Sequence, residues 1–170
     1  AYKNLAACFH GPNRELTTML KGLERRLGVL GSGALSYAAL MRNEFESLKD
    51  LEELKIDFAR LFVGPYSLLA PPYGSIYLEG ERKIMGHSTL DMLETYRNAG
   101  VDLSDKFRDA PDHIAAELEF MYFLVFKEIE ALENSDIETT LGFLEKQRAF
   151  LRKHLGAWVF DFADSTEEKA

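Results

Sequence analysis

Apolar side chains recur at helical spacing along most of the sequence, most strongly between Ile114 and Phe126. Leu118, Met121 and Val125 follow Ile114 at intervals of four, seven and eleven residues, which places all four on one face of a helix. Other aromatic and aliphatic residues widen this face until little of the circumference stays polar. The pattern predicts a central, nearly enclosed helix around which the rest of the chain packs.

The start of this helix is also marked in the sequence. Asp109 is a suitable N-cap, and Pro111 suits the first turn because a proline has no N–H group that needs a partner there. Asp112 would place a negative charge at the positive end of the helix dipole. We therefore predict a polar first turn on an otherwise apolar helix.

Other stretches show the same period and are bounded by glycine, proline or capping residues. They cover residues 14–27, 35–48, 50–62, 88–99 and 136–154, and residues 1–12 could hold a further short helix. Residues 155–162 are apolar enough to dock onto the bundle, and Asp164–Ala170 is expected to be a solvated tail. No segment alternates with a two-residue period, so no sheet is predicted. The sequence indicates an all-α single domain over residues 1–170, a bundle of about six or seven helices.

The helical period disappears between Gly64 and Gly86, where prolines and aromatic residues are frequent. A loop of this length in a compact domain is usually functional or disordered. Tyr66, Tyr73 and Tyr77, with neighbouring aliphatic residues, favour a long loop that packs onto the helices. These tyrosines would serve packing or ligand contact equally well.

Composition narrows the classes of partner. The chain has 170 residues, 28 acidic and 20 basic, and its net charge of -8 disfavours nucleic acid and anionic membranes and favours a cationic partner. No apolar run reaches the roughly 18 residues that span a bilayer, so no stable membrane insertion is expected. The single cysteine, Cys8, excludes an internal disulfide and a cysteine-rich zinc site, which makes a reducing cytoplasm the simplest compartment.

Familiar enzyme motifs are missing from the sequence, including Gly-x-Ser-x-Gly, a phosphate-binding glycine-rich loop and His-Glu-x-x-His. His113 and Glu117 lie one helical turn apart and could bind a metal, but the Glu-x-x-His pairs of carboxylate-bridged metal bundles are absent. A small helical metal-binding protein or enzyme that uses these two residues is the alternative function. The main prediction is a protein without catalytic residues and without a cofactor.

Asp112, His113 and Glu117 are the candidate binding residues at the helix start. Together they would form an acidic lip on the otherwise apolar helix, beside the aromatic loop. An acidic lip next to an apolar groove complements a peptide in which arginines are followed by hydrophobic residues. The alternative for His113 is structural, as a cap that ties the preceding loop to the helix.

Four segments, taken in their order and spacing along the chain, indicate a relationship to a known family. They are Phe58–Gly64 (FARLFVG), Ala70–Tyr77 (APPYGSIY), Pro111–Met121 (PDHIAAELEFM) and Phe150–Trp158 (FLRKHLGAW). In this combination the chain resembles the TorD/DmsD family of redox-enzyme maturation chaperones, which also includes NarJ-like proteins. The resemblance covers most of the chain from about residue 58 to residue 160, whereas the N-terminal third matches only in its helical character.

The resemblance implies an all-helical cytoplasmic chaperone that binds the twin-arginine leader of a molybdenum-cofactor oxidoreductase subunit. Such a chaperone holds the apo-subunit back from export until the cofactor is inserted, and some members form domain-swapped homodimers. Asp112 and His113 match the family's Asp-His signature for leader binding. The family's loop motif matches Pro71, Tyr73, Gly74, Ser75 and Tyr77 of this sequence.

In the predicted site, Asp112 would pair with a leader arginine while His113 and Glu117 position it, and the groove would bury the leader's apolar segment. Members of the family commonly continue with another helix beyond the position of Ala170. We therefore expect either that a C-terminal helix is missing from this chain or that a partner chain supplies part of the groove.

Overall fold

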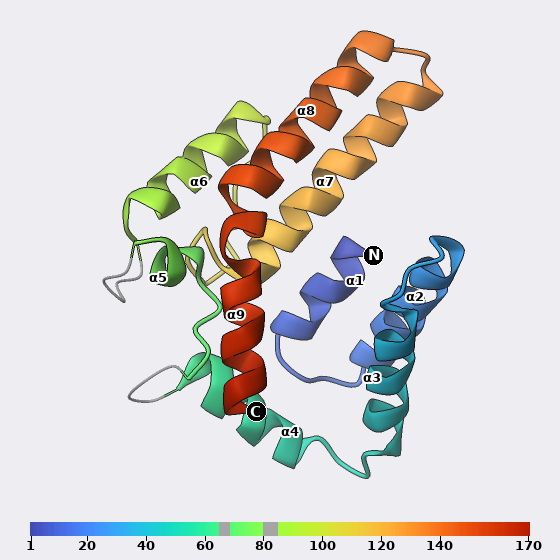
Figure 1. The fold of residues 1–170 in the computed structure, drawn as a ribbon, viewed down its shortest axis with the longest axis vertical. Helices are drawn as coiled ribbons and strands as arrows, with labels where there is room; N and C mark the ends of the chain where they lie inside the picture. Colours follow the sequence, from blue (N-terminus) through green and yellow to red (C-terminus); the bar gives the residue numbers. More distant parts are fainter. Residues whose placement is uncertain (65–68, 80–84) are drawn as a thin grey trace.

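Helix α7 (Ile114–Glu133) runs through the middle of the structure, a computed structural model that describes residues 1–64, 69–79 and 85–170 (Figure 1). Helix α8 (Ile137–Lys153) returns antiparallel to α7, and α9 (Leu155–Lys169) continues after a break at His154. These three helices pack against one another and form the frame on which the other helices are placed.

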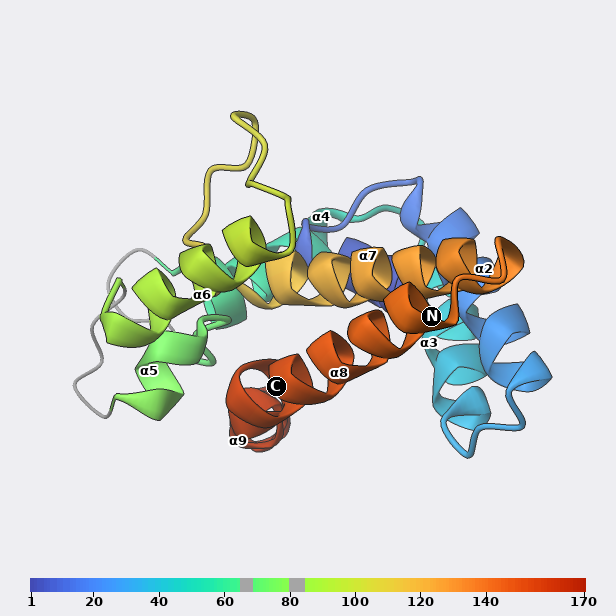
Figure 2. The same cartoon turned by 90° about the horizontal axis from the view of Figure 1, so that it is seen from above.

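The remaining helices surround this frame. They are α1 (Tyr2–Ala6), α2 (Leu16–Val29), α3 (Leu35–Ser47), α4 (Glu52–Phe58), α5 (Gly74–Leu78) and α6 (His87–Asn98). A 3-10 turn (Ala7–Phe9) follows α1, and a π-helical turn (Ala59–Val63) follows α4. Helix α1 packs directly on α7, and the α2–α3 hairpin and the α5–α6 pair lie on opposite sides of α7 (Figures 1 and 2). The connection from α6 to α7 projects from the bundle as a long loop (Figure 2).

Aromatic side chains fill the space between the helices. The Phe120 ring of α7 stands edge-on to Phe150 of α8, with 4.9 Å between ring centroids, and lies 4.7 Å from the Tyr96 ring of α6. Phe162 of α9 lies 5.7 Å from Phe9, so a second aromatic contact ties α9 to the N-terminal segment. Burial of these rings stabilises the bundle more than helical propensity does.

The all-α class predicted from the hydrophobic pattern is confirmed. Within the described ranges the chain forms nine α-helices and no strand, apart from an isolated bridge between Tyr73 and His113. The predicted number of six or seven was too low because it did not include α5, whose five residues are too few to display a helical period, or α9 (Leu155–Lys169). Of Ser135 and Asp136, the two residues that the sequence offers as a cap for α8, the structure uses Asp136, whose carboxylate accepts a hydrogen bond from the Thr139 N–H at 3.0 Å.

Helix α5 also corrects the prediction of one continuous loop between Gly64 and Gly86. Its five residues follow the extended Tyr73, and its first N–H groups are satisfied by Asp112, which comes from a distant part of the sequence. No local sequence pattern predicts such a helix. Tyr66, one of the three tyrosines expected to pack in this segment, lies outside the described residues.

The expectation that α7 is nearly enclosed is correct only for its first half. Ile114 and Met121 are each 1% exposed, whereas Tyr122 and Phe126 are 40% and 50% exposed. The far half of α7 projects together with α8 beyond the end of α1, so its outer face stays open (Figure 1). None of the described helices combines the length and the apolarity that crossing a membrane requires.

The predicted solvated tail at Asp164–Ala170 is wrong, because α9 continues to Lys169. The buried Phe162 anchors the helix, and adding residues to an existing helix is far easier than starting one. The Ser165 hydroxyl also donates a hydrogen bond to the Leu69 carbonyl at 3.4 Å. The polar residues therefore form the outer turns of a docked helix.

We expect Phe150→Ala to lower the free energy of unfolding by about 3 to 5 kcal/mol, because it removes a ring that is 1% exposed and packed on Phe120. Urea denaturation followed by circular dichroism measures this loss. Phe160→Ala is the matched control, since the Phe160 side chain is 74% exposed and its removal should change stability by less than about 0.5 kcal/mol. Equal losses in both variants would contradict the described core.

Candidate functional site

Two short segments run side by side at the start of α7. The Gly74 N–H donates a hydrogen bond to the Asp112 carbonyl at 2.9 Å, and the Ile114 N–H donates to the Pro72 carbonyl at 2.9 Å. This pairing satisfies backbone groups that would otherwise be buried without a partner. It also holds the chain extended before Ile114, so that α7 begins there.

His113, rather than Asp109, is the N-cap of α7. Its Nδ1 accepts a hydrogen bond from the Ala115 N–H at 3.1 Å, and its ring stands edge-on to Tyr73, with 5.2 Å between centroids. The predicted cap at Asp109 is wrong, and Pro111 precedes the helix instead of occupying its first turn, because Pro111 and Asp112 form a turn and His113, which pairs with the loop, is extended. The structural role considered for His113, as a cap that ties the loop to the helix, is confirmed.

Asp112 joins three helices through its buried carboxylate. One oxygen accepts a hydrogen bond from the Ser75 N–H in the first turn of α5 at 2.8 Å, and the other accepts one from the Thr89 hydroxyl of α6 at 3.0 Å. The side chain is 1% exposed, and Ser75 is fully buried. A buried charge is tolerated only when hydrogen bonds replace its water shell, and these two donors do so.

Glu117, one turn further along α7, faces α9. The Trp158 indole N–H lies 3.1 Å and 3.3 Å from the two carboxylate oxygens. Burial raises the pKa of Glu117 well above its ordinary value, and the nearby charge of Asp112 acts in the same direction, while the hydrogen bond from Trp158 opposes the shift. Gly74 lies against both groups: a Cβ there would come within 2.9 Å of the Trp158 nitrogen, so a larger residue would not fit without a shift.

The other predicted loop residues lie around this network. The Tyr73 hydroxyl donates a hydrogen bond to the Asp109 carboxylate at 3.0 Å, and burial raises the pKa of Tyr73. The Tyr77 ring stacks on Trp158, with 5.5 Å between centroids and 19° between the planes. Pro71 is half-buried at the entry to this segment. The predicted association of the loop with the start of the central helix is therefore present.

The charged residues of this region are nevertheless buried. Asp112 and Glu117 are each 1% exposed, and His113 is 5% exposed. The predicted exposed acidic lip is therefore wrong, because the paired loop, α5 and α9 cover the first turn of α7. In this structure an approaching peptide would not contact the two carboxylates directly.

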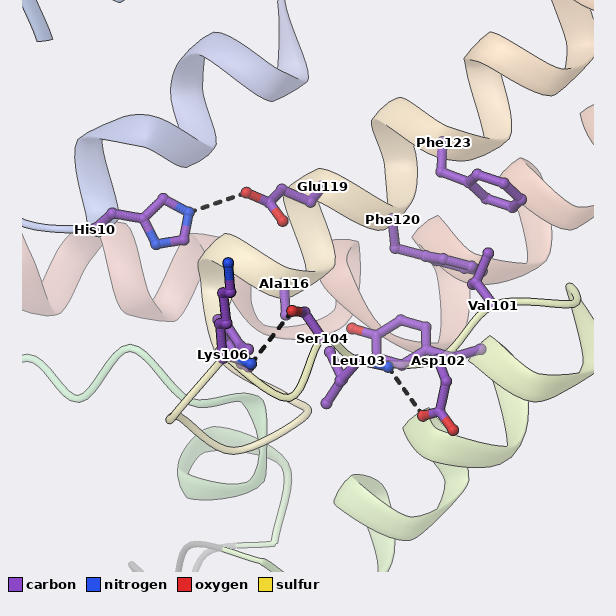
Figure 3. Close-up of a pocket in the computed structure, with 12 residues that line it drawn as sticks. His10, Val101, Asp102, Leu103, Ser104, Lys106, Ala116, Glu119, Phe120 and Phe123 are labelled. Carbon is purple, nitrogen blue, oxygen red and sulfur yellow. Dashed lines mark hydrogen bonds and ion pairs between the residues drawn. The ribbon is translucent and has the colours of Figure 1, made fainter. Parts of the chain in front are cut away.

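A groove of about 450 Å³ opens beside the buried network, between α7, the loop that follows α6, and the N-terminal segment (Figure 3). Its apolar wall comprises Tyr96, Val101, Leu103, Phe107, Ala116, Phe120 and Phe123. Its polar edge comprises His10, Asp102, Ser104, Lys106 and Glu119. None of the eight predicted site residues lies in this lining, although the His113 ring lies 6.1 Å from that of Phe107.

Glu119 is an exposed carboxylate of this region, and the sequence prediction did not include it in the site. Its side chain is 53% exposed and accepts a hydrogen bond from His10 Nε2 at 3.0 Å (Figure 3). Two residues along a helix correspond to roughly 200° of rotation, so Glu119 faces away from Glu117. Its position three residues after Ala116 and four before Phe123, on the same helix face, was the signal that could have identified it.

The alternative of a metal site gains no support from the geometry. Among the residues that the structure describes, no three histidine, cysteine, aspartate or glutamate side chains are close enough to share a metal ion. His113 and Glu117 hydrogen bond to different partners, the Ala115 N–H and the Trp158 indole.

The fold itself is shared with a known class of protein. A crystal structure of an Archaeoglobus fulgidus protein assigned as a redox enzyme maturation protein superposes with a TM-score of 0.53, covering 88% of this chain and 91% of that one at 21% identity. This likeness establishes the all-helical fold of that class.

Sequence comparison identifies the family. The profile of the nitrate reductase delta subunit family matches residues 13–164. The chain therefore belongs to this family, and the predicted relationship to the TorD and DmsD chaperones is confirmed. It is 32% identical over 132 residues to the chaperone protein TorD of Photobacterium profundum, which covers 75% of this chain and 60% of that protein.

Two other relatives show the same relationship. The chaperone protein TorD of Aliivibrio salmonicida is 26% identical over 156 residues, covering 91% of this chain and 70% of the relative. The Tat proofreading chaperone DmsD of Salmonella typhi is 37% identical over 67 residues, covering 39% of this chain and 33% of the relative. The chain thus spans only part of the length of each of these curated relatives.

We expect Asp112→Ala to lower the free energy of unfolding by about 2 to 4 kcal/mol, because the Ser75 N–H and the Thr89 hydroxyl would lose their partner inside the protein. Thermal or urea denaturation measures the change. Asp105→Ala, in an exposed position of the loop before α7, is the matched control and should leave stability nearly unchanged. A stable Asp112→Ala variant would show that the buried carboxylate does not hold these helices together.

Glu117→Gln should make the stability of the protein less dependent on pH. The pKa of Glu117 is raised above its ordinary value of 4.5 in the folded state, so the folded state binds more protons than the unfolded state above that pH. The contribution of Glu117 to the stability of the native protein should therefore fall as the pH rises above 4.5. In Glu117→Gln the neutral amide keeps an oxygen that accepts the Trp158 N–H, and it does not ionise, so this decrease of stability with rising pH should disappear.

Urea midpoints of the native protein and of Glu117→Gln, measured at a series of pH values from 4.5 upward, test whether the substitution reduces the pH dependence of stability. Glu133→Gln, at an exposed position of α7, is the matched control. Only Glu117→Gln should flatten the profile. Parallel profiles for all three proteins would mean that Glu117 does not carry an elevated pKa.

Proposed function

We propose that this protein is a cytoplasmic chaperone that binds the twin-arginine leader and the apo form of a molybdenum-cofactor oxidoreductase subunit before export. Membership of the family supports this function, as do the chaperone names of the relatives. The observation that carries it is the groove beside α7, in which an apolar wall meets exposed carboxylates.

The groove has the chemistry that a leader peptide requires. The rings of Phe107, Phe120 and Phe123 would take the apolar segment of the leader, because burying that segment supplies most of the affinity. Glu119 and Asp102 at the edge offer carboxylates to the arginines, and a guanidinium can engage a carboxylate through two N–H groups at once. The net charge of -8 would favour approach of a cationic leader.

The eight residues predicted for peptide binding have a supporting role in this proposal. Asp112, His113 and Glu117 fix the first turn of α7, in which the groove residue Ala116 also lies, and the groove residue Glu119 stands in the next turn. Pro71, Tyr73, Gly74, Ser75 and Tyr77 provide the loop that holds this turn in place. They would shape the leader site from inside the protein without touching the peptide.

The proposed function involves neither catalysis nor a cofactor. The chaperone domain is proposed to span residues 1–170 and to act alone or as a domain-swapped homodimer. Sedimentation velocity of the purified chain distinguishes these two assemblies.

Isothermal titration calorimetry with two synthetic peptides tests the proposed function. A twin-arginine leader peptide should bind, and a control in which both arginines are lysines should bind about tenfold more weakly, because an ammonium group cannot reproduce the bidentate geometry. Equal binding of both peptides, or no binding of either, would contradict the proposal.

A further inference from the structure

One edge of the groove carries a pair of residues from distant parts of the chain. His10 follows the 3-10 turn of the N-terminal segment, and Glu119 stands on α7 (Figure 3). Their side chains point toward each other, with 3.0 Å between His10 Nε2 and the carboxylate. Both side chains are partly open to solvent, at 41% and 53% exposure. The contact therefore lies where a ligand in the groove could reach it.

We propose that Glu119 is the carboxylate that receives an arginine of the leader, and that His10 occupies Glu119 in the free protein and is displaced on binding. This inference rests on the proposed function. It assigns Glu119 as the residue that binds the leader arginine and His10 as a gate, that is, a side chain that blocks Glu119 until the leader binds. His10 would act as a gating residue and would make no contact with the peptide once displaced.

The other acidic groups of this region are less suited to the role. Asp112 and Glu117 are buried and hydrogen bonded inside the protein. The Asp109 carboxylate accepts a hydrogen bond from the Tyr73 hydroxyl, and one oxygen of Asp102 accepts one from the backbone N–H of the next residue. Glu119 is an exposed carboxylate in the groove lining that a single imidazole N–H occupies.

An arginine can displace His10 for simple chemical reasons. A neutral imidazole offers one N–H to Glu119, whereas a guanidinium offers two in a planar fork and is always charged. Phe9 anchors the backbone next to His10 by packing on Phe62 and Phe162, with 5.9 Å and 5.7 Å between ring centroids. The His10 side chain can therefore swing away without release of the N-terminal segment.

The gate makes leader binding sensitive to pH. The hydrogen bond to Glu119 raises the pKa of His10 above its ordinary value of 6.5, although partial burial opposes the shift. Below this pKa a protonated His10 holds Glu119 as an ion pair, so binding should weaken as the pH falls. The other titratable groups near His10 are Asp109 and His113, with Lys3 and Glu15 on one side and Asp102 and Lys106 on the other.

Calorimetric titration of the full chain with the twin-arginine peptide at about pH 6 and about pH 8 tests the inference. Glu119→Gln should weaken binding about tenfold, because the amide keeps the shape of the side chain and loses its charge. Glu133→Gln is the matched control, with the same loss of charge on the same helix at an exposed position outside the groove lining. It should bind like the native protein.

His10→Gln should have the opposite effect at low pH. Because the hydrogen bond to Glu119 raises the pKa of His10, the protonated form that holds Glu119 is favoured at the lower pH. Removing the charged form should therefore tighten binding at that pH by at least about threefold and bring the affinities at the two pH values together. Circular dichroism confirms that each variant is folded, as expected for partly exposed side chains.

The outcomes separate this inference from the function on which it rests. Failure of the native protein to bind the twin-arginine peptide would overturn the proposed function and the inference together. If the native protein binds and prefers arginine to lysine, an unchanged affinity in Glu119→Gln would overturn only the assignment of Glu119. An unchanged pH dependence in His10→Gln would overturn the gate.

A double-mutant cycle adds a readout that a purely structural role of Glu119 would not move. Replacing the leader arginines by glutamine should weaken binding to the native protein much more than binding to Glu119→Gln. Equal effects in the two proteins would show that Glu119 and the arginines do not interact, and would overturn the assignment.

Discussion

The hydrogen bonds of one buried carboxylate, that of Asp112, organise the centre of this protein. An aspartate that is 1% exposed loses its hydration, and the Ser75 N–H and Thr89 hydroxyl replace it. These bonds fix the start of α5 and of α6 against the residue that precedes the cap of α7. Because those elements come from separate parts of the chain, removing the carboxylate would leave two donors unsatisfied and loosen three helices at once.

This constraint also decides where a ligand can bind. The loop, α5 and α9 cover the first turn of α7, so the charged residues there make hydrogen bonds inside the protein and are not accessible to a ligand. The surface that remains available is the next turn, where Glu119, Phe120 and Phe123 face the groove. The geometry of the groove thus depends on the buried network behind it. A substitution in that network would change binding through the position of α7.

Acidic residues on one helix therefore have different physical roles. Glu117 is enclosed with the Trp158 indole, and burial favours its neutral form. Glu119, two residues later, is half-exposed and paired with His10, so its charge is available to a cationic group. The difference arises from packing, because α9 covers one side of α7 while the groove leaves the other side open.

The sequence by itself determined the helical class, the position of most helices and the family, because hydrophobic periodicity and motif order are local properties of the chain. It also indicated that the Pro71–Tyr77 loop meets the Asp112–Glu117 segment. Only the tertiary structure decided that this meeting buries the carboxylates, that His113 caps α7, and that the polar C-terminal residues continue α9. The groove with His10 and Glu119 could not be predicted from the sequence either, since its walls come from segments about a hundred residues apart that only the fold brings together.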